Sequence, residues 1–286
     1  MSNASYLLKH PKERTTSVVF SSPHSGREYP ESFVKQSVLD PLTLRSSEDA
    51  FVDLLFKQVT DFGAPMISAV FPRAWVDLNR RHDEFDPALI EGLVRGVLSP
   101  RVTSGLGVVP RVVAGGRNIY RGKLTREEVR SRIEVFWKPY HAALKSLLDE
   151  AHAAFGQSIL IDCHSMPHEA LVSSGPRMAK LPEIVVGDRY GASADPRIVA
   201  QVEAAFRAEG FAVTRNMPFA GAFVVEHYGR PTQRRHAIQV EIDRSLYMNE
   251  ARIEPRAEFA EVRAALLRAA RRVAAIEADD VPLAAE

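Results

Sequence analysis

Two histidines, each expected in the loop that follows a short β-prone run, carry the clearest chemical signal in the sequence. Residues 17–22 lead to His24, and residues 158–163 lead to His164. In open α/β sheets, ligands bind beyond the carboxyl ends of the strands, so we expect both imidazoles to face that crevice. Imidazole is a common zinc ligand, and the pair therefore predicts a metal site. Two unrelated histidines bonded to the backbone are the alternative, since nine histidines allow chance pairings.

A catalytic zinc usually keeps three protein ligands, so the histidines need a carboxylate beside them. Glu48 and Asp49 precede an apolar stretch, and either is a candidate. The alternative is that they only stabilise a helix N-terminus. Glu241 follows the apolar run 237–240, where a buried carboxylate is costly unless it is paired, bound to metal or functional. Beside a zinc site it would act as a general base, and a salt bridge with Arg244 is the alternative.

Asn79 and Arg80 are candidates for binding a substrate carboxylate, because a guanidinium binds that group through two parallel hydrogen bonds. Spacing does not distinguish the further arginine candidates, which are Arg73, Arg81, Arg111, Arg117, Arg121 and Arg244. The glycine-rich segments do not match a dinucleotide or phosphate loop, and no G-x-S-x-G motif is present. A nucleotide site or a serine nucleophile therefore has no motif to support it.

Strands that alternate with helices are expected to position these residues. The strand-like segments are residues 17–22, 66–70, 158–163, 183–187, 212–214 and 236–242, with a short extended segment at 75–78. Helical spacing marks a helix capped by 47–49 and helices over about 125–155, 196–210 and 255–277. This alternation predicts an α/β fold with a mostly parallel sheet covered by helices on both faces, in one domain of residues 5–280. The excursion 83–123, with a hairpin between 108–110 and 112–114, is expected to shape the pocket.

Composition argues against several classes of protein. Lys and Arg total 37 against 36 Asp and Glu in 286 residues, which gives no basic surface for nucleic acid or membrane. Cys163 is the single cysteine, so no intrachain disulfide can form, which fits a reducing compartment. No apolar run of about 18 residues and no secretory signal pattern are present. We therefore expect a cytoplasmic protein, whose oligomeric state the sequence does not predict.

An ordered set of short motifs extends over most of the chain. The set consists of Ser22-Pro23-His24-Ser25-Gly26, Glu48-Asp49, Val76-Asp77-Leu78-Asn79-Arg80, Trp137-Lys138-Pro139-Tyr140-His141, Asp162-Cys163-His164-Ser165, Val186-Gly187-Asp188, His227-Tyr228-Gly229, Gln239-Val240-Glu241-Ile242 and Leu246-Tyr247-Met248. Each motif alone is short, but their order is specific. The set resembles the N-formylglutamate amidohydrolase family, which is related to zinc carboxypeptidases and aspartoacylases.

This resemblance implies a phosphorylase/hydrolase-like three-layer α/β sandwich that holds one zinc ion per chain. The zinc ligands that it implies are His24, Asp49 and His164. Asp49 is preferred to Glu48 because it matches the family's acidic position better. Glu241 is implied as general base and acid, and Asn79 with Arg80 as the group that binds a substrate carboxylate. Arg73, Arg121 and Arg244 complete the predicted substrate-binding set.

The implied reaction is hydrolysis of N-formyl-L-glutamate to formate and L-glutamate, in histidine breakdown. Zinc would lower the pKa of its bound water towards about 7, and Glu241 would transfer the proton. The chain departs from the family at Glu226, where a basic residue is expected, and in the excursion 83–123. The alternatives are a zinc amidohydrolase for another N-acyl or N-formimino amino acid, and then a non-catalytic binder of acidic small molecules.

Overall fold

The computed structural model describes residues 5–94, 96, 98–173 and 181–277, and its centre is a seven-stranded sheet. In spatial order the strands are β1 (Tyr6–Lys9), β3 (Met66–Ala69), β2 (Val18–Ser22), β6 (Ser158–Met166), β9 (Arg235–Asp243), β7 (Ile184–Gly187) and β8 (Val213–Arg215). The four strands from β3 to β9 are parallel, whereas β1 and β7 run antiparallel to their neighbours β3 and β9. The predicted mostly parallel, mixed sheet is confirmed.

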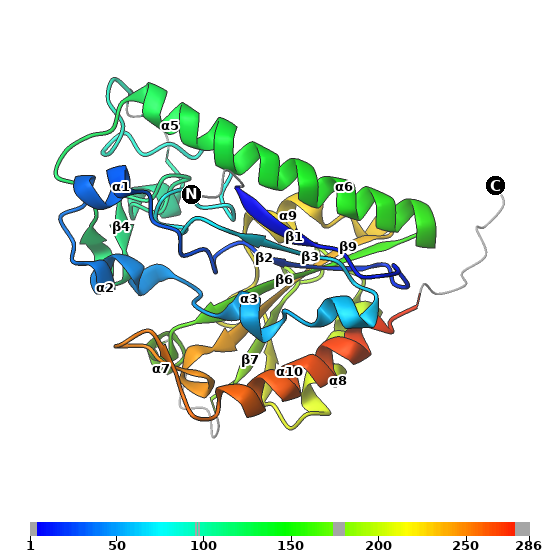
Figure 1. Ribbon diagram of the computed structural model, residues 1–286. Helices are drawn as coiled ribbons and strands as arrows, with labels where there is room; N and C mark the ends of the chain where they lie inside the picture. Colours follow the sequence, from blue (N-terminus) through cyan, green and yellow to red (C-terminus); the bar gives the residue numbers. More distant parts are fainter. Residues whose placement is uncertain (1–4, 95, 97, 174–180, 278–286) are drawn as a thin grey trace.

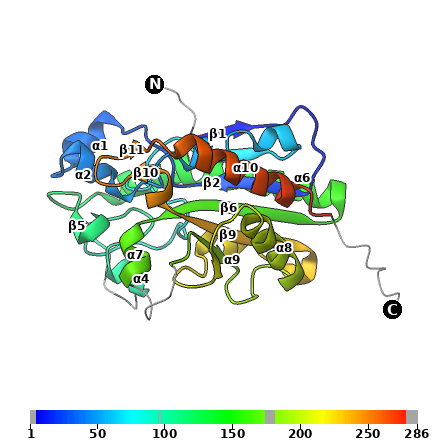
Figure 2. The same ribbon diagram turned by 90° about the horizontal axis from the view of Figure 1, so that it is seen from below.

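Helices cover both faces of the sheet and complete three layers (Figure 1 and Figure 2). One face carries α5 (Arg126–Arg132), α6 (Lys138–Phe155) and α9 (Phe223–Tyr228), and the other carries α3 (Val52–Leu55), α8 (Pro196–Arg207) and α10 (Phe259–Ala274). Successive residues of β2 alternate between the layers: Val18 and Phe20 pack with α8 and α10, and Val19 packs with α6. The sheet is therefore buried on both sides, as parallel sheets usually are.

The remaining elements are short and lie between the strands and the long helices. They are α1 (Glu31–Gln36), α2 (Pro41–Leu44), α4 (Pro100–Thr103), α7 (His168–Ser173), the 3₁₀ turns Arg45–Ser47, Val59–Phe62, Ala114–Gly116, Pro231–Gln233 and Arg244–Leu246, and the strand pairs β4 (Val112–Val113) with β5 (Arg117–Asn118) and β10 (Met248–Asn249) with β11 (Glu254–Pro255).

The helix predicted over 125–155 is present, with a π-helical turn inside it. Thr125 caps its start, and the Thr125 side chain accepts a hydrogen bond from the amide of Glu128 at 3.2 Å. The π turn Ile133–Trp137 joins α5 to α6, and Gly156 ends α6 with a left-handed φ of 68°. Such turns are frequent at functional sites, and this one lies next to residues 78–80, whose contacts are described below.

The helix predicted after 47–49 is wrong in its start and in its length. α3 has only four residues, and a 3₁₀ turn at Val59–Phe62 follows it. Phe51, directly before α3, has a φ of 67°, so the backbone turns there and does not continue a helix. The amide of Asp49 donates to the carbonyl of His24 at 3.0 Å. Asp49 is therefore tied to the turn after β2 and does not cap a helix.

Three other local predictions are also wrong. β6 continues to Met166, so His164 lies within the strand and not in a loop after it. Residues 75–78 form turns and irregular backbone instead of an extended segment. The hairpin pairs β4 with β5, not 108–110 with 112–114. Gly115 and Gly116 make its turn with φ of 72° and 69°, values that glycine adopts without a Cβ clash.

Buried polar side chains fix the segment 83–123 to the rest of the molecule. Arg132 on α5 is 1% exposed, and its guanidinium lies 3.5 Å from the ring centroid of Trp75. The same guanidinium donates to the hydroxyl of Tyr120 at 2.7 Å. Within the segment, Arg111 donates to Asp86 at 2.9 Å. The predicted excursion is thus a packed part of the fold.

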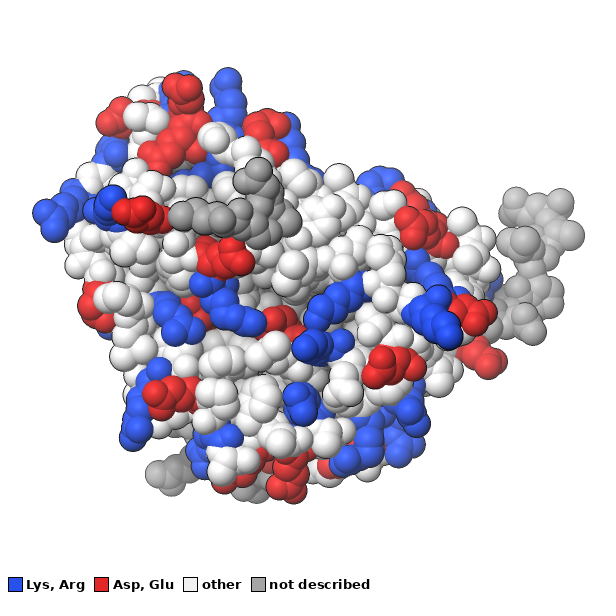
Figure 3. Space-filling model, viewed as in Figure 1, with Lys and Arg blue, Asp and Glu red and all other residues white. Residues whose placement is uncertain are grey.

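The surface shows no dominant charge on the face in Figure 3, where Lys and Arg side chains are mixed with Asp and Glu. This mixture agrees with a formal net charge of +1. Within the described ranges, none of the helices has the length and apolar character needed to cross a membrane.

Candidate metal centre and active site

A cavity of about 670 Å³ opens beyond the carboxyl ends of the parallel strands. His24 comes from the turn after β2, His164 from β6 and Glu241 from β9. β6 and β9 pair so that His164 is the register partner of Glu241. Because neighbouring strands lie about 4.8 Å apart, partners in register place their side chains next to each other on one face. The sheet thus brings together residues that are distant in the sequence.

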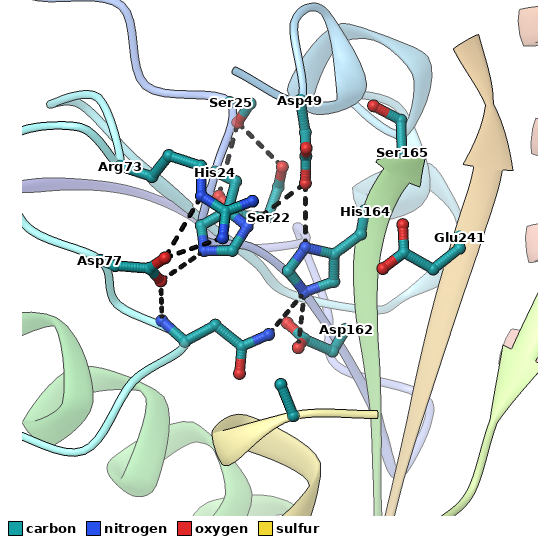
Figure 4. Close-up of polar contacts among 12 residues, drawn as sticks. Ser22, His24, Ser25, Asp49, Arg73, Asp77, Asp162, His164, Ser165 and Glu241 are labelled. Carbon is teal, nitrogen blue, oxygen red and sulfur yellow. Dashed lines mark hydrogen bonds and ion pairs between the residues drawn. The ribbon is translucent and has the colours of Figure 1, made fainter. Parts of the chain in front are cut away.

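His24, Asp49 and His164 form a buried group whose ligand atoms all lie within 4.8 Å of one another. Asp49 Oδ2 is 2.9 Å from His164 Nδ1 and 3.3 Å from His24 Nδ1. The two imidazole centroids are 4.7 Å apart, and Figure 4 shows the Asp49 carboxylate facing both rings. Two imidazole nitrogens and one carboxylate oxygen are therefore directed towards a common point.

A buried aspartate holds the far nitrogen of each imidazole (Figure 4). His24 Nε2 is 2.7 Å from Asp77 Oδ1, and His164 Nε2 is 2.8 Å from Asp162 Oδ2. An aspartate that accepts a hydrogen bond from Nε2–H keeps the proton on that nitrogen. The Nδ1 lone pair is then free for a metal, and the orientation of the ring is fixed. We call these two histidines together with Asp49, Asp77 and Asp162 the histidine–carboxylate cluster.

The cluster fits a divalent metal ion. His24 Nδ1 is buried without a hydrogen-bond partner among the described residues, which is costly unless another group binds it. Burial opposes a charge on Asp49, but the two imidazoles, when they are protonated, hold the pKa of its carboxyl well below the usual range, and a bound cation would act in the same direction. Asp49 is therefore an anion at neutral pH. Two imidazoles and one carboxylate, with space left in the cavity, match the ligands of catalytic zinc sites.

Glu241 lies beside the cluster, and its carboxylate points towards His164 (Figure 4). Gln239 Nε2 donates to Glu241 Oε1 at 2.8 Å and so fixes the carboxylate. Burial raises the pKa of Glu241 to about 7. A carboxyl group with that pKa can both accept and release a proton near neutral pH, which is what a general base and acid needs.

Three arginines from the segment after β3 line the cavity, and we call Arg73, Arg80 and Arg101 the arginine wall. Arg73 donates to Asp77 Oδ2 from Nε at 3.2 Å and from Nη2 at 2.8 Å. Arg80 donates from Nε to the carbonyl of Leu106 at 2.9 Å. The Arg101 side chain makes no hydrogen bond or ion pair with any residue that the structure describes. Pairing with carboxylates therefore decreases from Arg73 through Arg80 to Arg101.

Asn79 and Arg244 line the same cavity and contact the cluster. Asn79 Nδ2 is 3.3 Å from His164 Nε2, and the amide of Val224 donates to Asn79 Oδ1 at 2.8 Å. Arg244 Nη2 donates to Asp49 Oδ1 at 2.9 Å, which leaves Asp49 Oδ2 to face the histidines. Both side chains are thus fixed before any ligand is present.

Trp137 and His141 fix the backbone on either side of Asn79. Trp137 Nε1 donates to the carbonyl of Arg80, and His141 Nε2 donates to the carbonyl of Leu78, each at 2.9 Å. The two rings are in contact, with centroids 3.9 Å apart and planes tilted by 31°. Burial lowers the pKa of His141 to about 3, so this imidazole is neutral at physiological pH.

Two residues that the sequence associates with the substrate lie outside the cavity. Arg121 is exposed and does not line the cavity, so the structure does not bring it to the other predicted substrate-binding residues. Glu226, where the chain departs from the family pattern, is exposed and pairs with Arg189 at 3.2 Å. An acidic residue at position 226 is therefore no obstacle to an acidic ligand in this cavity.

The choice between Glu48 and Asp49 is decided by their partners. Glu48 accepts hydrogen bonds from Arg45 at 2.9 Å and from the hydroxyl of Tyr29 at 2.6 Å, so its carboxylate is already paired. Asp49 alone of the two carboxylates belongs to the group that can hold a metal ion.

Four polar residues of the site are missed by the sequence interpretation: Asp77, Arg101, Asp162 and Gln239. Two of them do carry a signal, because Asp162 precedes His164 by two positions and Gln239 precedes Glu241 by two. Residues two apart in a strand share a face, so each is directed to the same cavity as its neighbour. Asp77 comes from irregular backbone, where no such period exists.

Comparison with known proteins gives consistent matches over the whole site. A sequence model described as N-formylglutamate amidohydrolase matches residues 16–248, which include every site residue above. An N-formylglutamate deformylase of Pseudomonas aeruginosa is 31% identical over 257 residues, covering 88% of this chain and 90% of that protein. One of Pseudomonas putida is 29% identical, covering 82% of each protein. The crystal structure of an N-formylglutamate amidohydrolase from Ralstonia eutropha has a TM-score of 0.87 and 37% identity, covering 95% of this chain and 97% of that one.

Proposed function

Because the chain belongs to the N-formylglutamate amidohydrolase family, we propose that it hydrolyses N-formyl-L-glutamate to formate and L-glutamate. The observation that carries this proposal is the buried group of His24, Asp49 and His164 with Glu241 beside it. We propose that this group holds one zinc ion per chain. The placement in histidine breakdown and in the cytoplasm stays a prediction.

The cluster is suited to metal-assisted hydrolysis. A zinc ion held by its three ligands supplies Lewis acidity, which polarises the formyl carbonyl and makes water acidic enough to attack near neutral pH. Asp77 and Asp162 accept hydrogen bonds from the two Nε2–H groups and so keep both imidazoles in the ligating tautomer. Arg244 holds the carboxylate of Asp49 in position through its outer oxygen.

Glu241 carries the proton through the reaction. It accepts a proton from the attacking water as the water oxygen bonds to the formyl carbon. When the carbon–nitrogen bond breaks, Glu241 donates that proton to the leaving nitrogen, which gives formate and the free amine. A pKa of about 7 suits both steps, because the group gains and loses its proton near working pH.

The positive residues of the cavity are suited to an acidic substrate. Arg80 and Asn79 are proposed to bind a substrate carboxylate, since the Arg80 guanidinium has N–H groups beyond those that bind backbone carbonyls. Arg73 is held by Asp77 near the cluster, where its charge would stabilise an oxyanion that develops on the formyl carbonyl.

The test is formate release from N-formyl-L-glutamate by protein whose metal content has been measured, with and without a chelator. We expect about one zinc per chain and release that stops on chelation and returns when zinc is added back. N-acetyl-L-glutamate and N-formimino-L-glutamate serve as comparison substrates.

The possible outcomes separate the metal from the substrate. Protein that binds zinc but releases formate from no N-formyl amino acid would contradict the proposed reaction and leave the metal site in place. Full activity after complete removal of the metal would contradict the proposed role of the cluster. If the protein turns over either comparison substrate faster, that compound and not N-formyl-L-glutamate is its substrate.

A further inference from the structure

The arginine wall includes one guanidinium that no described residue neutralises. Arg101 lies on α4, is exposed and lines the cavity that contains the cluster. Four arginines line this cavity, and three of them have an aspartate partner: Arg73 with Asp77 at 2.8 Å, Arg80 with the same Asp77 at 4.0 Å, and Arg244 with Asp49 at 2.9 Å. A ligand that pairs with Arg101 therefore displaces no partner among the described residues.

The backbone that carries Arg101 is fixed although its side chain is free. The amide of Leu106 donates to the carbonyl of Arg101 at 2.9 Å, and the carbonyl of Leu106 accepts from Arg80 Nε at 2.9 Å. Leu106 thus links the two arginines directly. Ser99 caps α4 by accepting from the amide of Val102 at 3.3 Å. The position from which Arg101 extends is therefore set relative to Arg80.

The charges around Arg80 indicate that this part of the wall is not fully neutralised. Burial lowers the pKa of the Arg80 guanidinium, and the positive charges of Arg73 and Arg101 contribute to the lowering, whereas Asp77 and Glu84 act in the opposite direction. Arg80 lies 4.0 Å from Asp77, further than Arg73 does at 2.8 Å. An anion bound between Arg80 and Arg101 would relieve this repulsion.

We propose that Arg101 binds the side-chain carboxylate of the substrate and so selects a dicarboxylate over the corresponding amide. This inference rests on the proposed function, which puts the formyl group at the cluster and leaves two carboxylates to bind. Arg73 and Arg244 are occupied by aspartates, so Arg80 and Arg101 are the two guanidinium groups available. Arg80 is 7% exposed and takes the inner carboxylate, whereas exposed Arg101 takes the outer one.

The test compares two substrates that differ only in the charge of the side chain, N-formyl-L-glutamate and N-formyl-L-glutamine. We expect Arg101→Ala to reduce the preference for glutamate in kcat/KM by about 10- to 100-fold, because a charge-assisted hydrogen bond is lost. Turnover of the glutamine substrate should change little. Arg101→Lys keeps the charge without the guanidinium fork and should restore part of the preference.

A binding measurement and two further variants complete the design. Calorimetry with the product L-glutamate and with L-glutamine should show the same loss of preference in Arg101→Ala, independent of turnover. Arg130→Ala, which removes an exposed arginine of α5 outside the cavity, should leave kcat/KM unchanged for both substrates. Arg80→Ala should weaken the binding of both substrates alike, because both retain the inner carboxylate.

The outcomes distinguish this inference from the proposed function. If the native protein hydrolyses N-formyl-L-glutamate but Arg101→Ala and Arg101→Lys keep its full preference over N-formyl-L-glutamine, only the role of Arg101 is overturned. If the native protein hydrolyses neither substrate, the proposed function fails and the inference fails with it. An equal loss for both substrates in Arg101→Ala also overturns the selective role.

Discussion

The histidine–carboxylate cluster and the arginine wall line the same cavity, yet their side chains are paired to different extents. In the cluster, a buried aspartate holds the far nitrogen of each imidazole, and Arg244 holds Asp49. In the wall, Arg73 has a carboxylate partner, Arg80 has mainly backbone carbonyls, and Arg101 has no partner in the described part of the chain.

This difference follows from what each region has to bind. Metal ligands require a preset geometry, which strands and buried hydrogen bonds provide. A substrate carboxylate brings its own charge, so an arginine that is already paired would have to lose its partner before binding it. An arginine without a partner, such as Arg101 on the short helix α4, avoids that cost. The segments between the strands also vary more readily than a sheet. The comparison therefore assigns the chemistry to the sheet and the selectivity to the wall.

The largest effect is expected at Glu241. Replacement by Gln keeps the size of the side chain but removes the group that carries the proton, so kcat should fall by about 100-fold or more while zinc stays bound. Steady-state kinetics together with metal analysis check this. Glu226→Gln, the same change at an exposed residue outside the cavity, should leave kcat unchanged. Normal turnover by Glu241→Gln would remove this residue from the mechanism.

The next effect concerns the aspartates that orient the histidines. Asp162→Asn replaces the carboxylate that accepts a hydrogen bond from His164 Nε2 with a neutral amide. Zinc affinity should therefore fall by about 10- to 100-fold. Competition with a chelating dye measures the affinity. Asp243→Asn is the matched control, because Asp243 makes a similar 2.8 Å contact with His168 outside the cluster. Equal zinc affinity in the two variants would contradict the assigned role of Asp162.

A smaller effect is expected where His141 supports the wall. Its pKa is about 3 in the folded protein and about 6.5 in an unfolded chain, so the unfolded state binds the proton first as pH falls. Stability should therefore be unaffected above about pH 6.5 and should fall between there and about pH 3. The loss from this group is about 2 kcal/mol at about pH 5.

Urea unfolding at about pH 7.5 and about pH 5 measures this loss. His141→Gln removes the titrating group and should lower the free energy of unfolding at both pH values, because contacts with Leu78 and Tyr228 are weakened. Its loss between the two pH values should be smaller than in the native protein. The same loss in both proteins would show that His141 does not set this pH dependence.

The smallest effect is expected at Arg121. The sequence makes it equivalent to the other arginine candidates, but its side chain is exposed outside the cavity. Arg121→Ala should therefore change KM for N-formyl-L-glutamate by less than about twofold, which corresponds to under about 0.5 kcal/mol. A rise in KM similar to that of an arginine of the wall would contradict this placement.

Local patterns explain which parts of the fold were predictable. The buried strands follow from short continuous apolar runs, and the long helix over 125–155 follows from a period of 3.6 residues, signals that each segment carries by itself. β1 has no such signal, because this edge strand depends on pairing with β3. The helix expected after 47–49 fails at Phe51, whose left-handed φ is imposed by the contacts around it and not by its own residue type.

The sequence by itself determined that His24, His164 and Glu241 face one crevice, because strand periodicity and the geometry of open α/β sheets aim them there. The family resemblance favoured Asp49 over Glu48, but only the tertiary structure gave a physical ground for that choice, and only it decided that Arg101 and not Arg121 lines the cavity. The physical reason is that neighbouring carboxylates, or arginines in one irregular segment, have the same local preferences. Their roles depend on partners brought near by long-range packing, as when Arg244 pairs with Asp49 at 2.9 Å.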